Sequence, residues 1–403
     1  MRLRRTNVLA TPLMIGLQLI GCLFFSWSAP WSAEAKTFVV NTTLDETDVN
    51  PGDGICVTAT QKCALRAAVQ EANAYPGPDT VQLRAGLYML TIQGRLEDAC
   101  ASGDLDILDD ITITGNGANR TFINGGSLDR VLHMVQPVSV KIIQLTIQNG
   151  LAGYSPSENA AGGGIYNNGG TLVVSKSSIS NNSALREGLA VCGGGIYSAS
   201  GQVTISESTV SENYAIGTYG SGQGGGGGIY VDGGILIVKQ SVVSGNTAGG
   251  YNGGYGGGIY NTSGTLTLVE STFSDNFAFG TGYPAGGGGI FTSRGQVTIR
   301  GSTISHNSVQ GTVQGSRGGG VAAYGSALTI LQSTISWNSC LGSYGQGGGI
   351  YASGDITIKM TSRISRNFAS SDGGGIFSES GTPIISSDSI VAKNIPNNQS
   401  PSP

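Results

Sequence analysis

The sequence is poor in charged residues and in histidine. Only 11% of its 403 residues are Asp, Glu, Lys or Arg, and only two residues, His133 and His306, are histidines. No histidine recurs with the serines that repeat along the chain, so those serines are not candidates for a nucleophile activated by a histidine base. The sequence therefore gives little reason to expect a metal or an organic cofactor, and we predict none.

Two further absences limit the class of protein. The 67 glycines follow no Gly-X-Y period, which excludes collagen. After residue 27 no apolar run approaches the 18 residues that a membrane helix needs, so we expect no membrane span in the mature chain. Hydrophobic residues nevertheless reach 39% and are regularly spaced, which favours a long buried core over disorder.

The first 35 residues have the features of a secretory signal peptide. A basic start precedes an apolar run over residues 8–27, and Ala33-Glu34-Ala35 fits a cleavage site before Lys36. We therefore expect residues 1–35 to be removed. A lipoprotein signal that uses Cys22 and an uncleaved anchor both remain open as alternatives.

Removal of this segment changes the charge. It takes three of the 21 basic and one of the 25 acidic residues, which leaves 18 basic and 24 acidic residues and a net charge of −6. A negative mature chain is not expected to bind nucleic acid or an anionic membrane surface.

An internal repeat dominates the rest of the chain. A Gly-Gly-Gly-Ile-Tyr-like block recurs every 26 to 33 residues, and its apolar residue falls at Ile165, Ile196, Ile229, Ile259, Ile290, Val321, Ile350 and Ile376. Apolar residues within each repeat alternate with polar ones, as in a strand that buries one face. Repeats of this length with three short strands favour a solenoid over a propeller, which needs about 40 residues per blade. We predict an all-β, right-handed parallel β-helix of about 9–11 coils.

Each repeat ends in an asparagine, which we expect to be structural. These residues are Asn182, Asn213, Asn246, Asn276, Asn307, Asn338 and Asn367, with less regular copies at Asn149 and Asn394. Asparagine tolerates the left-handed backbone of a sharp corner, and stacked amides can hydrogen-bond along the axis. The same internal role is predicted for Ser208, Ser271, Ser302 and Ser333.

The segment before the repeats predicts a cap. Within Cys63–Asn73, the residues Leu65, Ala68, Val69 and Ala72 fall on one helical face, and a helix there could cover the exposed end of the solenoid. We therefore assign residues 36–125 to the N-terminal cap and first coils. Residues 126–394 form the β-helix repeats, and residues 395–403 a polar tail.

Cys63–Asn73 resembles the CSLREA motif at the start of bacterial exported β-helix proteins, although Ala64, Ala67 and Val69 depart from it. The repeats are similar to those of polymorphic outer membrane proteins, within a pectin-lyase-like fold. The resemblance implies a secreted or cell-surface protein, associated in some relatives with the outer membrane and often adhesin-like. It implies no settled activity.

Five cysteines follow the signal segment. Cys56 and Cys63 close a small loop, and we predict a disulfide between them, as export to an oxidising compartment allows. Cys192 and Cys340 lie five coils apart, about 24 Å at 4.8 Å per coil, too far for a bond. The sequence leaves the state of Cys100, Cys192 and Cys340 open.

Two outward features are candidates for binding. The first is an aromatic stripe, one residue after each inward isoleucine: Tyr166, Tyr197, Tyr230, Tyr260, Phe291, Tyr351 and Phe377, interrupted by Ala322. Such a stripe could contact sugar rings or a protein, or its rings could only stabilise one another across strands. The second is the set of loops after the asparagines, rich in Gly, Ser and Tyr, which form either an adaptable contact surface or passive slack.

The alternative function is catalysis on polysaccharides. A pectate lyase-like site needs clustered carboxylates for calcium and a basic residue, and a glycosidase needs paired carboxylates. The acids instead gather near the cap, at Asp45, Asp48, Asp53, Asp104, Asp106, Asp109 and Asp110. We therefore predict a non-enzymatic exported protein that binds a polysaccharide or a cell-surface protein, with a polysaccharide lyase as the alternative.

Overall fold

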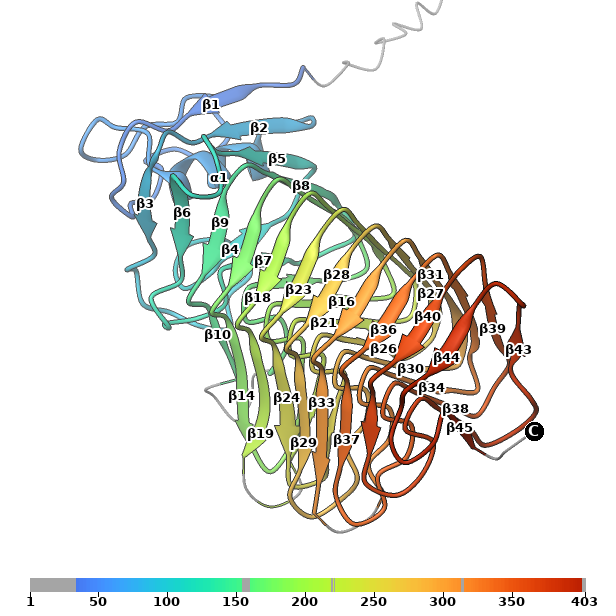
Figure 1. Ribbon diagram of the computed structural model, residues 1–403. Coiled ribbons are helices and arrows are strands. Elements are labelled where there is room, and N and C mark those ends of the chain that lie inside the picture. Colours follow the sequence, from blue (N-terminus) through green and yellow to red (C-terminus); the bar gives the residue numbers. More distant parts are fainter. Residues whose placement is uncertain (1–33, 154–159, 219, 221, 313–314, 401–403) are drawn as a thin grey trace, which may run out of the picture. The chain divides into compact units, whose positions relative to one another are not determined.

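A computed structural model describes residues 34–153, 160–218, 220, 222–312 and 315–400 (Figure 1). The predicted signal peptide lies outside these residues apart from its last two. Glu34–Pro403 forms one compact unit. Its described part contains one α-helix and 45 strands, and neighbouring strands pair in parallel. The predicted parallel β-helix is confirmed, and among the described residues no helix is long and apolar enough to cross a membrane.

Three long sheets, here called walls, enclose the core of the solenoid. Wall I contains the strands that follow the glycine blocks, β11 (Ile165–Asn167), β16 (Ile196–Ala199), β21 (Ile229–Asp232), β26 (Ile259–Asn261), β30 (Ile290–Ser293), β34 (Val321–Tyr324), β38 (Ile350–Ala352) and β42 (Ile376–Ser378). It continues at its two ends into β4 (Leu105–Ile107), β7 (Leu132–Met134) and β45 (Gln399–Ser400). β45 pairs with β42, so the solenoid extends into the segment predicted as a polar tail.

Wall II follows wall I in each coil. Its strands are β1 (Thr37–Val39), β2 (Asp79–Gln82), β5 (Ile111–Thr114), β8 (Ser139–Ile143), β12 (Thr171–Ser175), β17 (Gln202–Ser206), β22 (Ile235–Lys239), β27 (Gly264–Val269), β31 (Gly295–Arg300), β35 (Ala327–Leu331), β39 (Ile356–Lys359) and β43 (Ile384–Ile385). Register is kept along the wall: Val203 lies beside Leu236, and Ile205 beside Val238. These four side chains point inward and are fully buried, as the period-two pattern predicts.

Wall III completes the core. Its strands are β3 (Gly86–Met89), β6 (Thr121–Asn124), β9 (Thr146–Gln148), β13 (Ser178–Ser180), β18 (Thr209–Ser211), β23 (Val242–Ser244), β28 (Thr272–Ser274), β32 (Thr303–Ser305), β36 (Thr334–Ser336), β40 (Arg363–Ser365) and β44 (Ile390–Ala392). One continuous apolar cluster fills the space between the walls from Phe38 to Ile376. The eleven or twelve strands of each wall agree with the predicted number of coils.

Two further sheets, one of outbound and one of return strands, project from the solenoid and are here together called the fin (Figure 1). Its outbound strands follow the asparagine corner: β10 (Leu151–Ala152), β14 (Ser183–Glu187), β19 (Tyr214–Thr218), β24 (Thr247–Gly250), β29 (Phe277–Gly280), β33 (Ser308–Gly311), β37 (Ser339–Leu341) and β41 (Phe368–Ala369). Its return strands are β15 (Ala190–Cys192), β20 (Gln223–Gly225) and β25 (Gly254–Tyr255).

The fin corrects the prediction of three strands per repeat. The segments after the asparagines are not slack, because successive coils align them in register and pair their backbones. Small side chains, among them Ala184, Val191 and Ala215, form a separate buried cluster between outbound and return segments. Their small size lets the outbound and return backbones approach closely. In the sequence these strands show only alternating Ala and Gly, which does not predict that they pair.

The asparagine ladder is present as predicted, with one correction. The Asn276 side chain accepts from the backbone N–H of Asn246 and donates to Asn307 Oδ1 at 2.9 Å. The left-handed residue is not the asparagine but the one before it, for example Asp275 with φ 58°. Asn149 occupies that left-handed position, and Gly150 stands where its coil would have a rung, donating to Asn182 Oδ1. The asparagine supplies the hydrogen bonds while its neighbour makes the bend.

Each glycine of the block has a separate steric reason, illustrated by one coil. Gly226 has φ +60°, the left-handed region that glycine adopts without strain. A Cβ on Gly227 would lie 2.5 Å from the backbone of Gly257 and of Thr247. A Cβ on Gly228 would lie 3.0 Å from the ladder amide of Asn246. The block therefore lets the returning chain pass directly over the asparagine ladder.

The helix α1 (Leu65–Ala74) contacts β1, β2 and β4 at the first coil. Leu65, Ala68, Val69 and Ala72 are buried, which confirms the predicted apolar face. Arg66 is also fully buried: it pairs with Asp45 at 2.8 Å and donates to three backbone carbonyls. The helix therefore fixes the surrounding loops by hydrogen bonds as well as by apolar contact.

Candidate functional site

The aromatic residues of wall I form one stacked ladder. Between neighbours from Tyr166 to Phe291 the ring centroids are 4.7 to 5.5 Å apart, and Tyr351 and Phe377 stack at 5.6 Å. The predicted stacking is confirmed. All of these positions are in register, which brings each ring over the next.

Tyr324 fills the interruption that the sequence predicted at Ala322. It lies two residues later on β34, so it points to the same side of the strand. Its ring lies 5.3 Å from that of Phe291 and 5.0 Å from that of Tyr351. A search at the i+2 position would have found it.

The fin covers much of this ladder. A Cβ on Gly225 of β20 would lie 2.7 Å from Tyr260 and 2.9 Å from Tyr230, so the return strand runs directly over the rings. Arg317 lies on the return segment of a later coil. Its guanidinium lies over the Tyr351 ring at 4.9 Å and donates to the hydroxyl of Tyr324. Burial raises the pKa of Tyr260 and of Tyr324 to about 12.

Burial divides the predicted binding residues. Phe291 is 6% exposed and Tyr351 is fully buried, so both serve packing. Tyr166, Tyr197, Tyr230, Tyr260 and Phe377 remain partly exposed. Whether these five contact a ligand stays a prediction.

The fin presents its own aromatic side chains. Tyr251 and Tyr283 are about half exposed at its edge, with ring centroids 6.1 Å apart. Tyr255 belongs to the same segment as Tyr251 but turns inward onto Tyr260 and Phe291. Tyr219 lies outside the described residues. The predicted contact loops therefore form an ordered surface, of which only part carries exposed rings.

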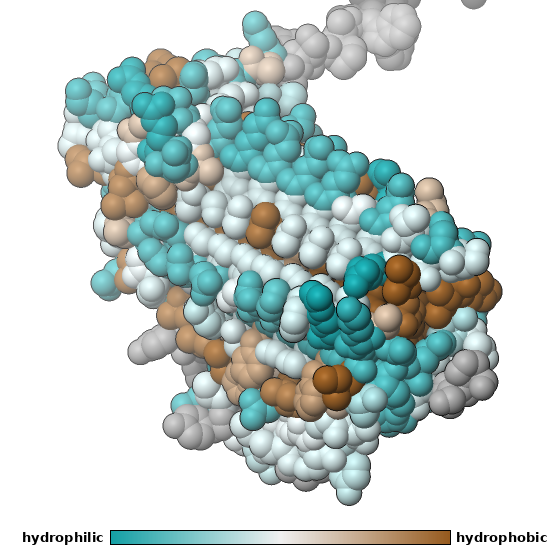
Figure 2. All heavy atoms as spheres, viewed as in Figure 1, coloured by the Kyte–Doolittle hydropathy of each residue, from teal (hydrophilic) through white to brown (hydrophobic). Residues whose placement is uncertain are grey.

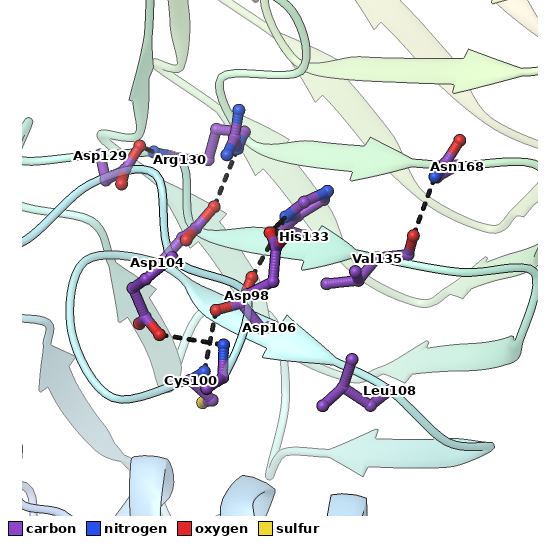
Figure 3. A network of polar contacts seen from close by, with 12 residues as sticks. Asp98, Cys100, Asp104, Asp106, Leu108, Asp129, Arg130, His133, Val135 and Asn168 are labelled. Carbon is purple, nitrogen blue, oxygen red and sulfur yellow. Dashed lines mark hydrogen bonds and ion pairs between the residues drawn. The ribbon is translucent and has the colours of Figure 1, made fainter. Parts of the chain in front are cut away.

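A polar network lies at the N-terminal end of the aromatic ladder (Figure 3). Asp106 of β4 and His133 of β7 are in register with Tyr166, and the His133 ring meets Tyr166 edge-on at 5.1 Å. Asp106 Oδ1 lies 3.1 Å from His133 Nδ1, and Asp106 Oδ2 accepts from the N–H of Cys100. Asp104 pairs with Arg130 at 2.8 Å.

Burial perturbs two carboxyl groups near this network. It is the main cause that raises the pKa of Asp106 to about 6. It also raises the pKa of Asp129 to about 7, and the nearby Asp104 charge adds to this shift. These groups are sequestered from solvent rather than arranged around an open site.

Asp98, Asp106 and His133 could together hold a cation. One imidazole and two carboxylates suit a transition metal better than calcium, which takes six to eight oxygen ligands. The separations of 3.1 and 3.5 Å from His133 Nδ1 to the two carboxylates are also those of hydrogen bonds and ion pairs. The group is thus explained without an ion.

The remaining acids near the cap hold backbone. Asp45 accepts from the N–H groups of Thr91 and Ile92, and Asp48 accepts from that of Val57. Asp53 and Asp110 likewise each accept a backbone N–H. These carboxylates, which a lyase or glycosidase interpretation would place around a substrate, accept hydrogen bonds from the backbone of loops and strand ends.

The cysteines separate into one bond and three thiols. Cys56 and Cys63 form a disulfide with their Cα atoms 5.1 Å apart. Cys100, Cys192 and Cys340 are free. Burial raises the pKa of each of these thiols to about 12, so they are not activated nucleophiles.

Comparison with known protein families places a match on one segment of the chain. Residues 176–199 match the Chlamydia polymorphic membrane protein repeat. This segment runs from the corner before β13 through β14 and β15 to the end of β16, and it includes the rung Asn182 and the glycine block before Ile196. No curated protein and no solved structure matches. The chain is thus a parallel β-helix of which one segment is similar to the repeat of polymorphic membrane proteins.

Proposed function

We propose that this is an exported, non-enzymatic binding protein of the cell surface or the secreted fraction, adhesin-like, which contacts glycan or protein through the fin and the partly exposed aromatic ladder. The matched repeat supports a surface location by its similarity to polymorphic membrane proteins. The observation that carries the proposal is the fin. Segments after the asparagines are ordered into a parallel sheet with Tyr251 and Tyr283 exposed, as a contact surface requires.

We also propose that Cys63–Asn73 is a variant of the CSLREA start motif. Glu71 accepts from the N–H groups of Gly52 and Gly54, and Asn73 bonds the backbone of Asp106 and Leu108. These contacts support a role in closing the N-terminal end of an exported β-helix. The glutamate that the motif would place at Ala67 is not needed for them.

A polysaccharide lyase of the pectin-lyase-like fold is the alternative, supported only by the parallel β-helix itself. The purified protein is incubated with polygalacturonate and with alginate, with and without calcium, while the absorbance of unsaturated products is followed. No product is expected. Product formation would overturn the binding proposal.

The binding surfaces are tested on a glycan array and on immobilised cell-surface protein. Tyr251→Ala and Tyr283→Ala change the fin, whereas Tyr230→Ala and Tyr260→Ala change the ladder. We expect the fin variants to lose binding of the wild-type ligands. Unchanged binding in all four variants would remove both surfaces as the contact site.

A further inference from the structure

A concave corner runs along the solenoid where wall III meets the fin. In each coil the left-handed residue before the ladder asparagine and the residue after it flank that buried asparagine. From the fourth outbound strand, β24, onward the pairs are Gly245 and Thr247, Asp275 and Phe277, His306 and Ser308, Trp337 and Ser339, Arg366 and Phe368, and Lys393 and Ile395. Coils are about 4.8 Å apart, so the corner presents two parallel rows of side chains.

The charge of this corner changes sign along the chain. Glu212 and Asp275 occupy it in the earlier coils, whereas Arg366 and Lys393 occupy it in the last ones. The whole chain follows the same trend. Residues 36–293 hold 11 basic and 20 acidic residues, and residues 294–403 hold seven basic and four acidic residues. A protein that is acidic overall thus has a cationic C-terminal third.

The corner deepens into a groove in this cationic part. Its volume is about 430 Å³, and its lining includes Trp337, Arg366, Phe368, Lys393 and Ile395. Trp337 is 51% exposed and Phe368 40% exposed. Figure 2 shows hydrophilic and hydrophobic surface side by side over the C-terminal strands of wall III. Exposed rings beside exposed cations distinguish this stretch from the rest of the corner.

The groove is ordered by contacts between coils. The Trp337 ring lies parallel to that of His306, with centroids 6.3 Å apart, and the Arg366 guanidinium lies 5.0 Å from the Trp337 ring. Within the described residues neither Arg366 nor Lys393 forms an ion pair with an acidic side chain. Their charge is therefore available to a ligand.

We infer that this groove binds an acidic polysaccharide, with its chain along the solenoid axis; the inference rests on the proposed binding function and names its ligand class. The cations at Arg366 and Lys393 suit carboxylate or sulfate groups, and Trp337 and Phe368 suit the apolar faces of sugar rings. An acidic peptide is the less favoured ligand. Strand-like peptides bind along an open sheet edge, whereas the corner crosses strands whose backbones already pair along the axis.

Fluorescence gives a direct test. The chain has three tryptophans, and in full-length protein carrying Trp27→Phe and Trp31→Phe the emission reports Trp337 alone. Polygalacturonate and dextran sulfate are titrated, with neutral dextran and poly-glutamate as controls. We expect the acidic polysaccharides to shift the emission, and salt to weaken their binding. No shift with either, or equal binding of poly-glutamate, would overturn the inference.

Variants test the cations. Arg366→Asn and Lys393→Asn suit their positive φ of 59° and 62°, and each is expected to weaken binding about tenfold or more, as for loss of one charge-assisted hydrogen bond. Arg294→Asn is the matched control, because Arg294 is an exposed cation with φ 58° at another corner. A loss equal to that in Arg294→Asn would overturn the assignment.

The two proposals fail in different ways. If Arg366→Asn and Lys393→Asn bind acidic polysaccharides like the wild type while the fin variants lose their ligands, the groove is not the polysaccharide site. The proposed binding function would then still stand. If the wild type binds nothing on the array, on cell-surface protein or in the titrations, the binding function itself fails.

Discussion

Asn276 lies in the middle of the asparagine ladder, and its replacement by alanine is expected to destabilise the solenoid strongly. The side chain is fully buried and makes four hydrogen bonds. Its oxygen accepts from the backbone N–H and the amide of Asn246, and its nitrogen donates to Val243 O and to Asn307 Oδ1. Alanine removes all four and puts no polar group in their place.

The magnitude follows from what each partner retains. The amide of Asn246 still donates to Val210 O, and Asn307 Oδ1 still accepts from the backbone N–H of residue 276. The backbone N–H of Asn246 is instead left buried without the oxygen that it bonds at 3.1 Å. One orphaned donor at about 1–3 kcal/mol and three lost bonds near 1 kcal/mol each give a loss of roughly 4–6 kcal/mol.

Urea unfolding followed by circular dichroism and by Trp337 fluorescence measures this loss. We expect the two probes to give the same urea midpoint, as they do when all coils unfold together. Coils that unfolded separately would give different midpoints. Asn168→Ala is the control: Asn168 is exposed and donates one bond, to Val135 O, so its loss should stay near 1 kcal/mol. If Asn276→Ala destabilises no more than this control, the ladder does not stabilise the fold as argued.

Three further predictions concern other parts of the fold. Gly227→Ala should lower the free energy of unfolding in urea by about 2–3 kcal/mol or more, because its Cβ would lie 2.5 Å from backbone atoms. The control Gly86→Ala should lower it far less, because there the closest atom is a side-chain methyl at 3.1 Å. Equal losses in the two variants would contradict the steric reason. Arg66→Met should lower the free energy of unfolding by about 3–5 kcal/mol, because it leaves the buried Asp45 carboxylate without its ion-pair partner. Thermal unfolding measures this loss, and Arg84→Met, at an exposed arginine, should be nearly neutral in the same assay. Because the folded pKa of Asp129, about 7, lies above its unfolded value, the folded state binds the extra proton; stability should therefore rise as pH falls from about 7 towards 4, by at most about 1.4 kcal/mol per pH unit. Asp129→Asn should reduce that slope, and an unchanged slope would exclude this carboxyl as its source.

The sequence was sufficient for features that repeat. Each coil must place the same residue types at the same place, so the inward isoleucines, the asparagine rungs and the stacked aromatic residues could all be predicted from spacing alone. The helical face from Leu65 to Ala72 was predictable for a similar reason, since its period of 3.6 is a local property.

The sequence was insufficient where a contact joins unlike segments. The fin escaped prediction because its strands bury alanine and glycine, which give almost no periodic hydrophobic signal. Tyr324 escaped because it reaches the ladder from two positions further along its strand. The acids near the cap looked like a cluster in sequence, but Asp45 and Asp104 are bound to arginines that are distant in the chain.

The sequence by itself determined the parallel β-helix, its coil length and which residue of each block faces the core, because stacking identical turns is the one way to bury a face that each turn repeats. Only the tertiary structure decided what lies outside that core. It placed the fin over the tyrosines and engaged the carboxylates near the cap in hydrogen bonds to the backbone of loops. It also brought Trp337, Arg366 and Lys393 from three coils into one groove. Those outcomes depend on which side chains meet across a corner, a relation that spacing along one chain does not contain.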